Sequence, residues 1–407
     1  MTTKTQMVRP KDSRAWLTAN VWFIALSAFF ADLGYQVVLA GFPLFLVLHL
    51  HAPIWTYGMA MAVAYGPGAL IAWWGGRVGD RRGHKRVALW GNAFIPVLAF
   101  AGWATTALGA IGLFSFGWWA RNFRSPSRRT MLREVVAESD RAKAFGFLHS
   151  LDVAGGMLAG LLLLALVAYQ VSFRTIFTLA LVPLGISTIM LGRVQAGRRP
   201  VPQPSTARAT SPKANPGNGA PTLYRGLLLS AALYGFSTYS IGFPILTVAQ
   251  GTHHTSFGIL AYILFLAVSA ITGLLFGRRA RATLPELAGW GYFGAALGSA
   301  GLALAYGFHL GLLGFAVPIA LLGFALGVIE TLEPTLVARF VPNVSAGQGL
   351  GGLTGARSLG LFVANGLMGL LYHFTPVYAY SYATGMALLA MVVVLLVHIR
   401  SLRITTL

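Results

Sequence analysis

Three ionisable side chains stand in long apolar stretches, where an uncompensated charge is expensive. Asp32 lies in FFADLGYQ, and Tyr35 and Gln36 follow it at the third and fourth positions, on the same face of a helix. No basic residue lies within several turns of Asp32 along the chain. Such an isolated acid suits reversible protonation, so we predict that Asp32 takes up and releases a proton. The alternative is a structural carboxylate that accepts hydrogen bonds from a neighbouring helix.

Asp152 and Arg357 are the other two charges, and we expect both to be structural. Arg121 and Arg124, at the end of another apolar stretch, are expected to neutralise Asp152. Abundant aromatic side chains would suit an apolar or cationic ligand, with helix packing as the alternative. Further polar residues are candidates for lining a binding cavity: Tyr35, Gln36, Tyr234, Ser237, Thr238, Tyr239 and Asn365. The run GFSTYSIGFP, with its glycines and proline, predicts a broken helix.

Membrane-spanning helices must position these residues. The chain of 407 residues is 56% hydrophobic and only 10% charged, with a mean hydropathy of +0.69, whereas about a quarter of the residues in a soluble domain are charged. A span needs about 20 mostly apolar residues. We therefore predict an all-α integral membrane protein with spans at 15–39, 52–75, 87–106, 108–124, 144–168, 173–193, 223–249, 256–277, 287–307, 310–330, 348–371 and 377–399.

The formal net charge of +20 has a membrane explanation. With twelve spans and the N-terminus inside, nearly all basic residues fall on the inner side, while Arg174 lies outside and Arg357 lies within a span. This asymmetry follows the positive-inside rule and places both termini in the cytoplasm. The basic inner surface would attract anionic lipid. No basic stripe on a soluble fold is present, so we expect no nucleic-acid partner.

The chain also divides into two similar halves. Residues 196–222 are rich in Pro, Ser, Ala and Gly and read as a cytoplasmic linker, which separates six-helix bundles at 1–195 and 223–407. Three pairs of segments recur in the same order: GYQVVLAGFPLFL and GFSTYSIGFPILT, GRVGDRRGHKR and GLLFGRRARAT, and GFLHSLDVAG and GGLTGARSLG. The third pair makes Asp152 and Arg357 counterparts. Parallel repeats of six spans with a site between them are a known transporter plan.

The segment GRVGDRRGHKR, between the second and third spans, resembles the loop 2–3 signature of the major facilitator superfamily. That resemblance implies two pseudo-symmetric six-helix bundles and alternating access. A narrower likeness, carried by FFADLGYQVVLAGFPLFL and by the region ARNFRSPSRRTMLREVVAESDRAKAFGFLHSLDVAGG, is to a prokaryotic permease subgroup whose substrates are mostly unassigned. It implies the cytoplasmic membrane of a prokaryote. Arg129 stands where that subgroup has an aspartate, so an inner ion pair of the subgroup is expected to be missing.

A conformational latch is expected at this loop. Gly76 and Gly83 would permit close helix approach and a tight reversal. The resemblance implies that Asp80 meets the positive N-terminal end of the eleventh span, near Gln348, with Arg357 as a possible direct partner. The remaining latch residues are Arg81, Lys85 and Arg86, which would pair with inner carboxylates such as Glu134, Glu138 or Asp140. The alternative is a positive-inside loop with a glycine turn.

These features predict a secondary transporter of a small molecule, with proton-coupled export of an amphipathic compound as the leading expectation. Uptake of a small solute or anion is the first alternative, and a lipid flippase or a non-transporting receptor on the same fold are others. Catalytic and nucleotide-binding motifs are absent from the sequence, so we expect neither an enzyme nor a cofactor. The outer histidine pairs 49/51 and 253/254 are expected to be solvated loop residues rather than metal ligands, and the protein is expected to be a monomer.

Overall fold

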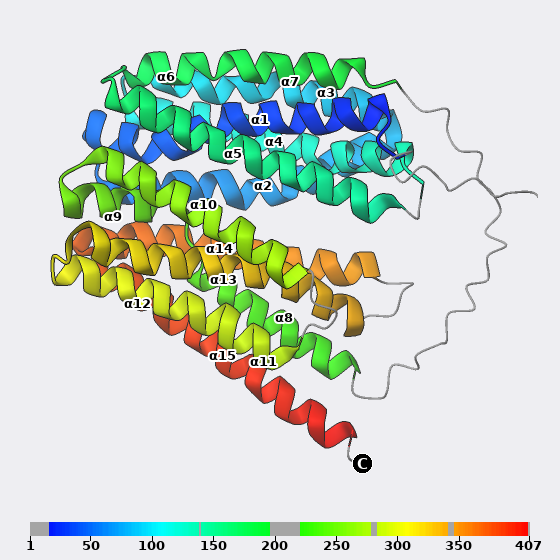
Figure 1. Cartoon of the computed structure of the whole chain (residues 1–407), viewed down its shortest axis with the longest axis vertical. Coiled ribbons are helices and arrows are strands. Elements are labelled where there is room, and N and C mark those ends of the chain that lie inside the picture. The colour runs from blue at the N-terminus through cyan, green and yellow to red at the C-terminus, as the bar shows by residue number, and fades with distance from the viewer. Residues whose placement is uncertain (1–15, 138–139, 196–219, 278–282, 341–345, 406–407) are drawn as a thin grey trace, which may run out of the picture.

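The computed structural model describes residues 16–137, 140–195, 220–277, 283–340 and 346–405 (Figure 1). Most of the expected linker, the basic N-terminal segment and Glu138 therefore lie outside the described residues. The described chain is almost entirely helical, because its apolar segments are long enough to satisfy their backbone groups internally within a membrane.

The first half contains six helical segments. The first is α1 (Ala19–Leu44), which continues as the π-helix η1 (Phe45–His49) after Pro43. It is followed by α2 (Ile54–Arg82), α3 (His84–Phe94) with its 3-10 continuation η2 (Ile95–Trp103), α4 (Ala107–Val135), α5 (Arg141–Ala168), and the pair α6 (Phe173–Leu179) and α7 (Leu181–Arg193).

The second half repeats this count within the described residues. Its seventh segment is interrupted, as the sequence predicts: α8 (Ala220–Ser237) ends and α9 (Gly242–Thr252) begins after a short non-helical stretch. The others are α10 (Thr255–Gly277), the run formed by α11 (Leu284–Glu286), η4 (Leu287–Phe293) and α12 (Gly294–Gly307), α13 (Gly311–Phe340), α14 (Ala346–Phe374) and α15 (Pro376–Thr405).

These segments confirm the predicted fold of twelve spans in two bundles, although several boundaries differ. Within the described residues, eight segments are long and apolar enough to cross a membrane by length and composition alone. The other four, α2, α3 with η2, α4 and α14, carry more charge or glycine. Several predicted ends were too early. Helices α2, α4, α13 and α15 continue to Arg82, Val135, Phe340 and Thr405, because a helix can carry charged residues at the end where it leaves the bilayer. The first segment continues to His49 instead of ending at residue 39.

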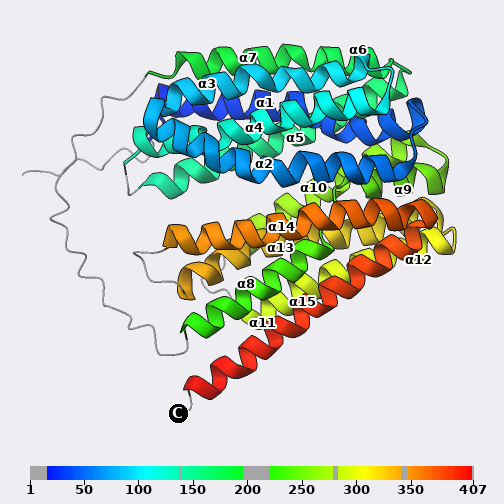
Figure 2. The ribbon, with the colours of Figure 1, turned by 180° about the vertical axis from the view of Figure 1, so that it is seen from behind.

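The two halves lie side by side, with α1–α7 in one layer and α8–α15 in the other (Figures 1 and 2). Helix α2 packs on α14, α5 on α10 and α1 on α9. Gly58 of α2 faces Gly369 of α14 so closely that a Cβ on either residue would collide with the other backbone. Small residues at such a crossing let two membrane helices approach closely.

The contacts between the halves gather toward one end of the molecule. The Tyr57 hydroxyl lies 2.7 Å from the Ser240 hydroxyl, and Tyr262 donates a hydrogen bond of 3.0 Å to the Gln36 amide oxygen. These residues lie toward the helix ends near His49 and far from Asp80. At the opposite end, where the C-terminus lies, the ribbons of the two halves diverge (Figures 1 and 2). The direct contacts between the halves named above thus lie away from Asp80, and the backbones of the halves are farther apart at the Asp80 end.

Candidate functional site

Asp32 is the centre of a polar chain inside the first half. Its side chain is only 4% exposed, and its Oδ1 atom accepts a hydrogen bond from the Tyr35 hydroxyl one helical turn along α1. Arg121 of α4 donates from Nη2 to the same Tyr35 oxygen at 3.3 Å. The second carboxylate oxygen, Oδ2, has no hydrogen-bond partner among the described residues. Carboxylate, phenol and guanidinium thus form a chain with one free acceptor, to which a proton can bind.

Arg121 is held by aromatic rings rather than by a direct ion pair. Its guanidinium carbon lies 4.8 Å from the centre of the Trp118 ring and 5.1 Å from that of Tyr35, and Nη1 donates to the Asn122 side chain at 3.2 Å. Trp118 also packs edge-on against Tyr65 of α2 at 5.2 Å. Cation–π contacts of this kind stabilise a desolvated guanidinium. The prediction that Arg121 pairs with Asp152 was wrong.

Asp152 pairs with Arg128 instead. Nη2 of Arg128 lies 3.3 Å from both carboxylate oxygens of Asp152, while Arg124, also expected at Asp152, donates to the Asn92 side chain at 2.6 Å. The difference arises from position along the helices. Arg128 lies two helical turns beyond Arg121 on α4, toward the Asp80 end, and is therefore beside Asp152 on α5. The expected structural role of Asp152 agrees with this pair, although its partner was misassigned.

Arg357 has two carboxylate partners in its own half. Its Nη2 lies 2.7 Å from Glu330, which is 55% exposed, and its Nη1 lies 3.3 Å from the fully buried Glu333. Tyr292 donates a hydrogen bond of 2.5 Å to Glu333. The expected pairing of Arg357 with Asp80 is therefore not present, because the carboxylates of Glu330 and Glu333 on α13 lie beside Arg357 on α14.

Sequence reasoning missed Glu333 and Tyr292. The predicted tenth span ended at Glu330, which left Glu333 outside the membrane. The available signal was the spacing of Glu330 and Glu333 in GVIETLEPTL, since residues three apart share a helix face.

The equivalent pairs of the two halves have opposite signs. In the first half an acid on the fifth segment, Asp152, meets an arginine on the fourth, Arg128. In the second half the arginine is on the eleventh segment and the acids Glu330 and Glu333 are on the tenth. The repeat therefore preserves the position of the ion pair and exchanges its charges.

At the expected latch, Asp80 is 73% exposed and lies 3.4 Å from His84, one turn away. Its expected partner at the start of α14, Gln348, has its side chain outside the described residues. Gly83 has φ of +91° and makes the predicted tight reversal. Close approach to α4 occurs at Gly75 and Gly79, whereas an added Cβ at Gly76 would meet only Pro126, at 3.6 Å. Arg81 and Arg86 are exposed and Lys85 is half-buried.

The predicted cavity residues divide between the polar chain, the interface and the helix break. Tyr35 belongs to the Asp32 chain, and Gln36 joins the halves through Tyr262. The others mainly make contacts within the second half. Tyr234 stacks on Tyr292, with 5.1 Å between the ring centres, and Ser237 and Thr238 donate hydrogen bonds to the Tyr234 carbonyl. The Tyr239 hydroxyl is hydrogen-bonded to that of Ser299, and the Asn365 side chain accepts a hydrogen bond of 2.9 Å from the Ser240 amide. Asn365 thus caps the backbone where α8 and α9 are interrupted.

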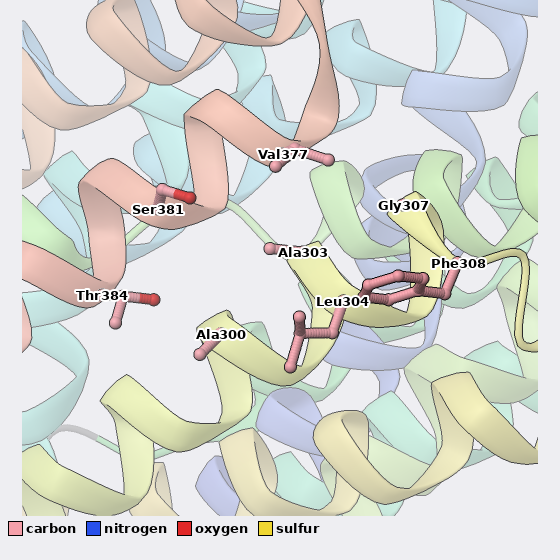
Figure 3. A pocket seen from close by; sticks show the side chains of 8 residues that line it. All are labelled: Ala300, Ala303, Leu304, Gly307, Phe308, Val377, Ser381 and Thr384. Atoms are coloured by element: carbon pink, nitrogen blue, oxygen red, sulfur yellow. The ribbon is translucent and has the colours of Figure 1, made fainter.

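Two cavities lie elsewhere. One, of about 440 Å³, lies between α12 and α15, where the Ser381 and Thr384 hydroxyls face the small residues Ala300 and Ala303 (Figure 3). The other, of about 310 Å³, is lined by apolar side chains of α2, α3 and α4, including Trp74 and Trp90. Neither cavity is lined by Asp32, Asp152 or Arg357.

Comparison with known proteins identifies the family. A sequence profile of the Major Facilitator Superfamily matches residues 24–364. The chain belongs to the Major Facilitator Superfamily. It is a multi-pass membrane transporter and not an enzyme.

Solved structures agree on the fold. The chain is similar to a D-xylose–proton symporter, with a TM-score of 0.77 and 13% identity over 93% of this chain and 97% of that one. It is also similar to the nucleoside transporter NupG, with a TM-score of 0.73 and 12% identity over 93% and 99% of the two chains. The inward-open xylose transporter XylE from E. coli gives a TM-score of 0.68 and 13% identity over 93% and 94%. No curated protein matches the sequence.

Proposed function

We propose that this chain is a proton-coupled secondary transporter of a small amphipathic molecule, with Asp32 as the group that carries the proton. The observation that supports the proposal is the free Oδ2 atom of Asp32, buried within the first bundle at the end of the Tyr35–Arg121 chain. A purely structural carboxylate would be expected to have both oxygens satisfied. A carboxylate with one free oxygen can instead exist in two protonation states with little rearrangement.

Alternating access would convert that proton exchange into coupled transport. The contacts of Tyr57 with Ser240 and of Tyr262 with Gln36 close one end of the molecule, and rocking of the halves would break them while the Asp80 end closes. The positive-inside rule predicts that the Asp80 end, where the halves diverge, faces the cytoplasm, so we take this arrangement as the one in which an exporter would load. We propose export if binding of the cargo releases the proton from Asp32. We propose uptake if the cargo and the proton bind together.

The proton site can be tested without knowing the cargo. Infrared difference spectra of the purified protein, recorded during a pH titration, detect carboxyl groups as they protonate. Asp32→Asn should delete one titrating carboxyl band, whereas the control Asp140→Asn, at a surface pair with Lys143, should leave that band in place. An unchanged titration in Asp32→Asn would show that Asp32 is structural.

Flux measurements then test coupling. Once a cargo is available, Asp32→Asn should keep exchange of cargo across proteoliposomes and lose accumulation driven by a pH gradient. Accumulation with the wild-type dependence on external pH would exclude Asp32 as the coupling group and leave Glu330 and Glu333 as the next candidates.

A further inference from the structure

The interior of the first half carries more positive than negative charge. Three arginines of α4 are buried or partly buried, at positions 121, 124 and 128, while Arg129 is exposed. The carboxylates beside them are those of Asp32 and Asp152. Within the described part of the chain, Arg128 alone of the three contacts a carboxylate directly. Buried charges are costly unless a counter-charge is near. The first half therefore contains a deficit of negative charge that a bound anion would fill.

The guanidinium nitrogens themselves show unused hydrogen-bonding capacity. Arg124 is fully buried, yet its Nε and Nη2 atoms have no hydrogen-bond partner among the described residues. The Nε atom of Arg121 is in the same condition. Arg121 differs from Arg124 in being partly exposed, and its electrostatic neighbours include Tyr65, which itself adjoins Ser240 of the other half. Of the three interior arginines, Arg121 is thus the one that a ligand between the halves would reach.

The aromatic rings at this place are already occupied by a cation of the protein. Arg121 lies over the rings of Tyr35 and Trp118. A cationic ligand would have to displace this guanidinium and would be repelled by the other arginines of α4. Of the two ligand types expected from the abundant aromatic residues, apolar and cationic, the cationic one does not fit the geometry here, and an anion with an apolar body does.

We propose that the transported molecule carries a carboxylate, sulfonate or similar anionic group that binds Arg121, and that it binds together with the proton of Asp32. This proposal rests on the proposed function and specifies its cargo. It also selects the cotransport direction, in which a proton gradient drives uptake of the anion.

The linkage between anion and proton follows from the shared chain of hydrogen bonds. When Asp32 is ionised, its charge acts on Arg121 through Tyr35 and opposes an incoming anion. When Asp32 is protonated, that opposing charge is gone and Arg121 attracts the anion more strongly. By thermodynamic reciprocity, anion binding then favours proton binding by the same factor.

The groups around Asp32 set the size of this linkage. Tyr35 lies on the same helix, Asp152 faces Asp32 from α5, Arg121, Arg124 and Arg128 face it from α4, and Tyr262 faces it from α10. Asp152 is tied to Arg128 by the ion pair, and Arg124 is bound to Asn92. Arg121 is thus the arginine whose charge is available both to Asp32, through Tyr35, and to a ligand.

The test uses probes of one shape and different charge. Benzoate and benzenesulfonate are the anions, benzyl alcohol is the neutral analogue and benzylamine is the cation, each added to purified protein while thermal unfolding is followed. Both anions should raise the unfolding temperature, and benzylamine should not. Arg121→Gln should weaken anion binding by about 10-fold to 100-fold, the worth of a lost hydrogen bond to a charged group. Stabilisation by benzylamine instead, or by none of the anions, would overturn the proposal.

Matched variants separate a binding role from a folding role. Arg174 lies over Trp103 at 3.5 Å, a similar stacked arrangement far from Asp32, so Arg174→Gln should bind the anions as the wild type does. If Arg121→Gln fails to fold, Arg121→Lys keeps the charge without the planar fork and should bind the anions more weakly than the wild type. Wild-type anion affinity in Arg121→Lys and Arg121→Gln alike would refute the site.

Proton uptake distinguishes this proposal from the proposed function. Benzenesulfonate stays ionised throughout the pH range, so any proton consumed when it binds in weakly buffered solution must enter the protein. We expect uptake approaching about one proton for each bound anion, and none in Asp32→Asn. If Asp32 titrates in the infrared experiment but anion binding consumes no proton, the anion proposal fails while the proton site stands.

Discussion

Replacing Arg357 by alanine would expose the difference between its two carboxylate partners. The substitution removes the guanidinium that lies 3.3 Å from the fully buried Glu333 and 2.7 Å from the 55% exposed Glu330. Glu330 can then be solvated by water. Glu333 retains one hydrogen bond, from Tyr292, and otherwise becomes a buried carboxylate without a counter-charge.

The two pairs should contribute unequally to stability. Removing one partner of a buried ion pair costs about 3–5 kcal/mol, and the geometry at Glu333 places it in this class. An exposed pair contributes about 0–1 kcal/mol, which is the range for Glu330. We therefore expect Arg357→Ala to lower the free energy of unfolding by about 3–5 kcal/mol, and Glu330→Gln by less than about 1 kcal/mol.

A double mutant isolates the cause. In Arg357→Ala combined with Glu333→Gln, no buried charge remains, so much of the stability lost in Arg357→Ala should return. Unfolding of the purified protein in a denaturing-detergent titration measures all the variants on one scale. The reasoning is refuted if Glu330→Gln destabilises as much as Arg357→Ala, or if the double mutant is no more stable than Arg357→Ala alone.

Three further predictions concern the latch, the crossing of α2 and α14, and the break between α8 and α9. Asp80→Asn should change the free energy of unfolding by less than about 0.5 kcal/mol, because Asp80 is exposed, yet it should slow closure of the Asp80 end. Equal distances between spin labels across that end in mutant and wild type, measured with cargo present, would contradict the latch. Gly369→Leu should force α14 away from Gly58 and increase cysteine labelling at the His49 end, and unchanged labelling would show that the contact is dispensable. Asn365→Ala should leave the Ser240 amide without its acceptor and cost about 1–3 kcal/mol, measured by the same detergent titration; wild-type stability would mean that water replaces the amide.

The fold could be predicted from the sequence because its signals are local and repeated. Twenty-residue apolar stretches, basic loops and paired motifs such as Gly41-Phe42-Pro43 and Gly242-Phe243-Pro244 each constrain topology without any knowledge of contacts. The interrupted seventh segment was predicted for the same reason, since glycine and proline act on the backbone beside them. The predicted helix ends were less accurate, because the hydropathy of the sequence falls before the helix ends.

The partners within the site were harder to predict. Asp32, Tyr35 and Arg121 were each singled out, but their connection depends on the rotation of α4 relative to α1, which no spacing within one helix reveals. The same is true of Asp152, where a shift of two turns along α4 decides between Arg121 and Arg128. Glu333 was missed because an acidic residue just beyond a predicted span boundary cannot be distinguished by sequence from a residue in a loop. The state of the latch depends on the position of the two bundles, which a single sequence does not specify.

The surplus of arginines on α4 has an electrical consequence. Arg121 and Arg124 lie within the apolar stretch 108–124 that is predicted to span the membrane, so they sit part of the way through the membrane potential. This potential acts on a whole elementary charge with about 2.3 kcal/mol per 100 mV. If rocking of the halves carries even a fraction of the unpaired charge along the field, the balance between the two open states depends on voltage. The opposite charge of the Glu330–Glu333 cluster would move in the other half and set the net sign. Capacitive currents from the empty protein in a planar bilayer would then report the conformational cycle with no cargo present.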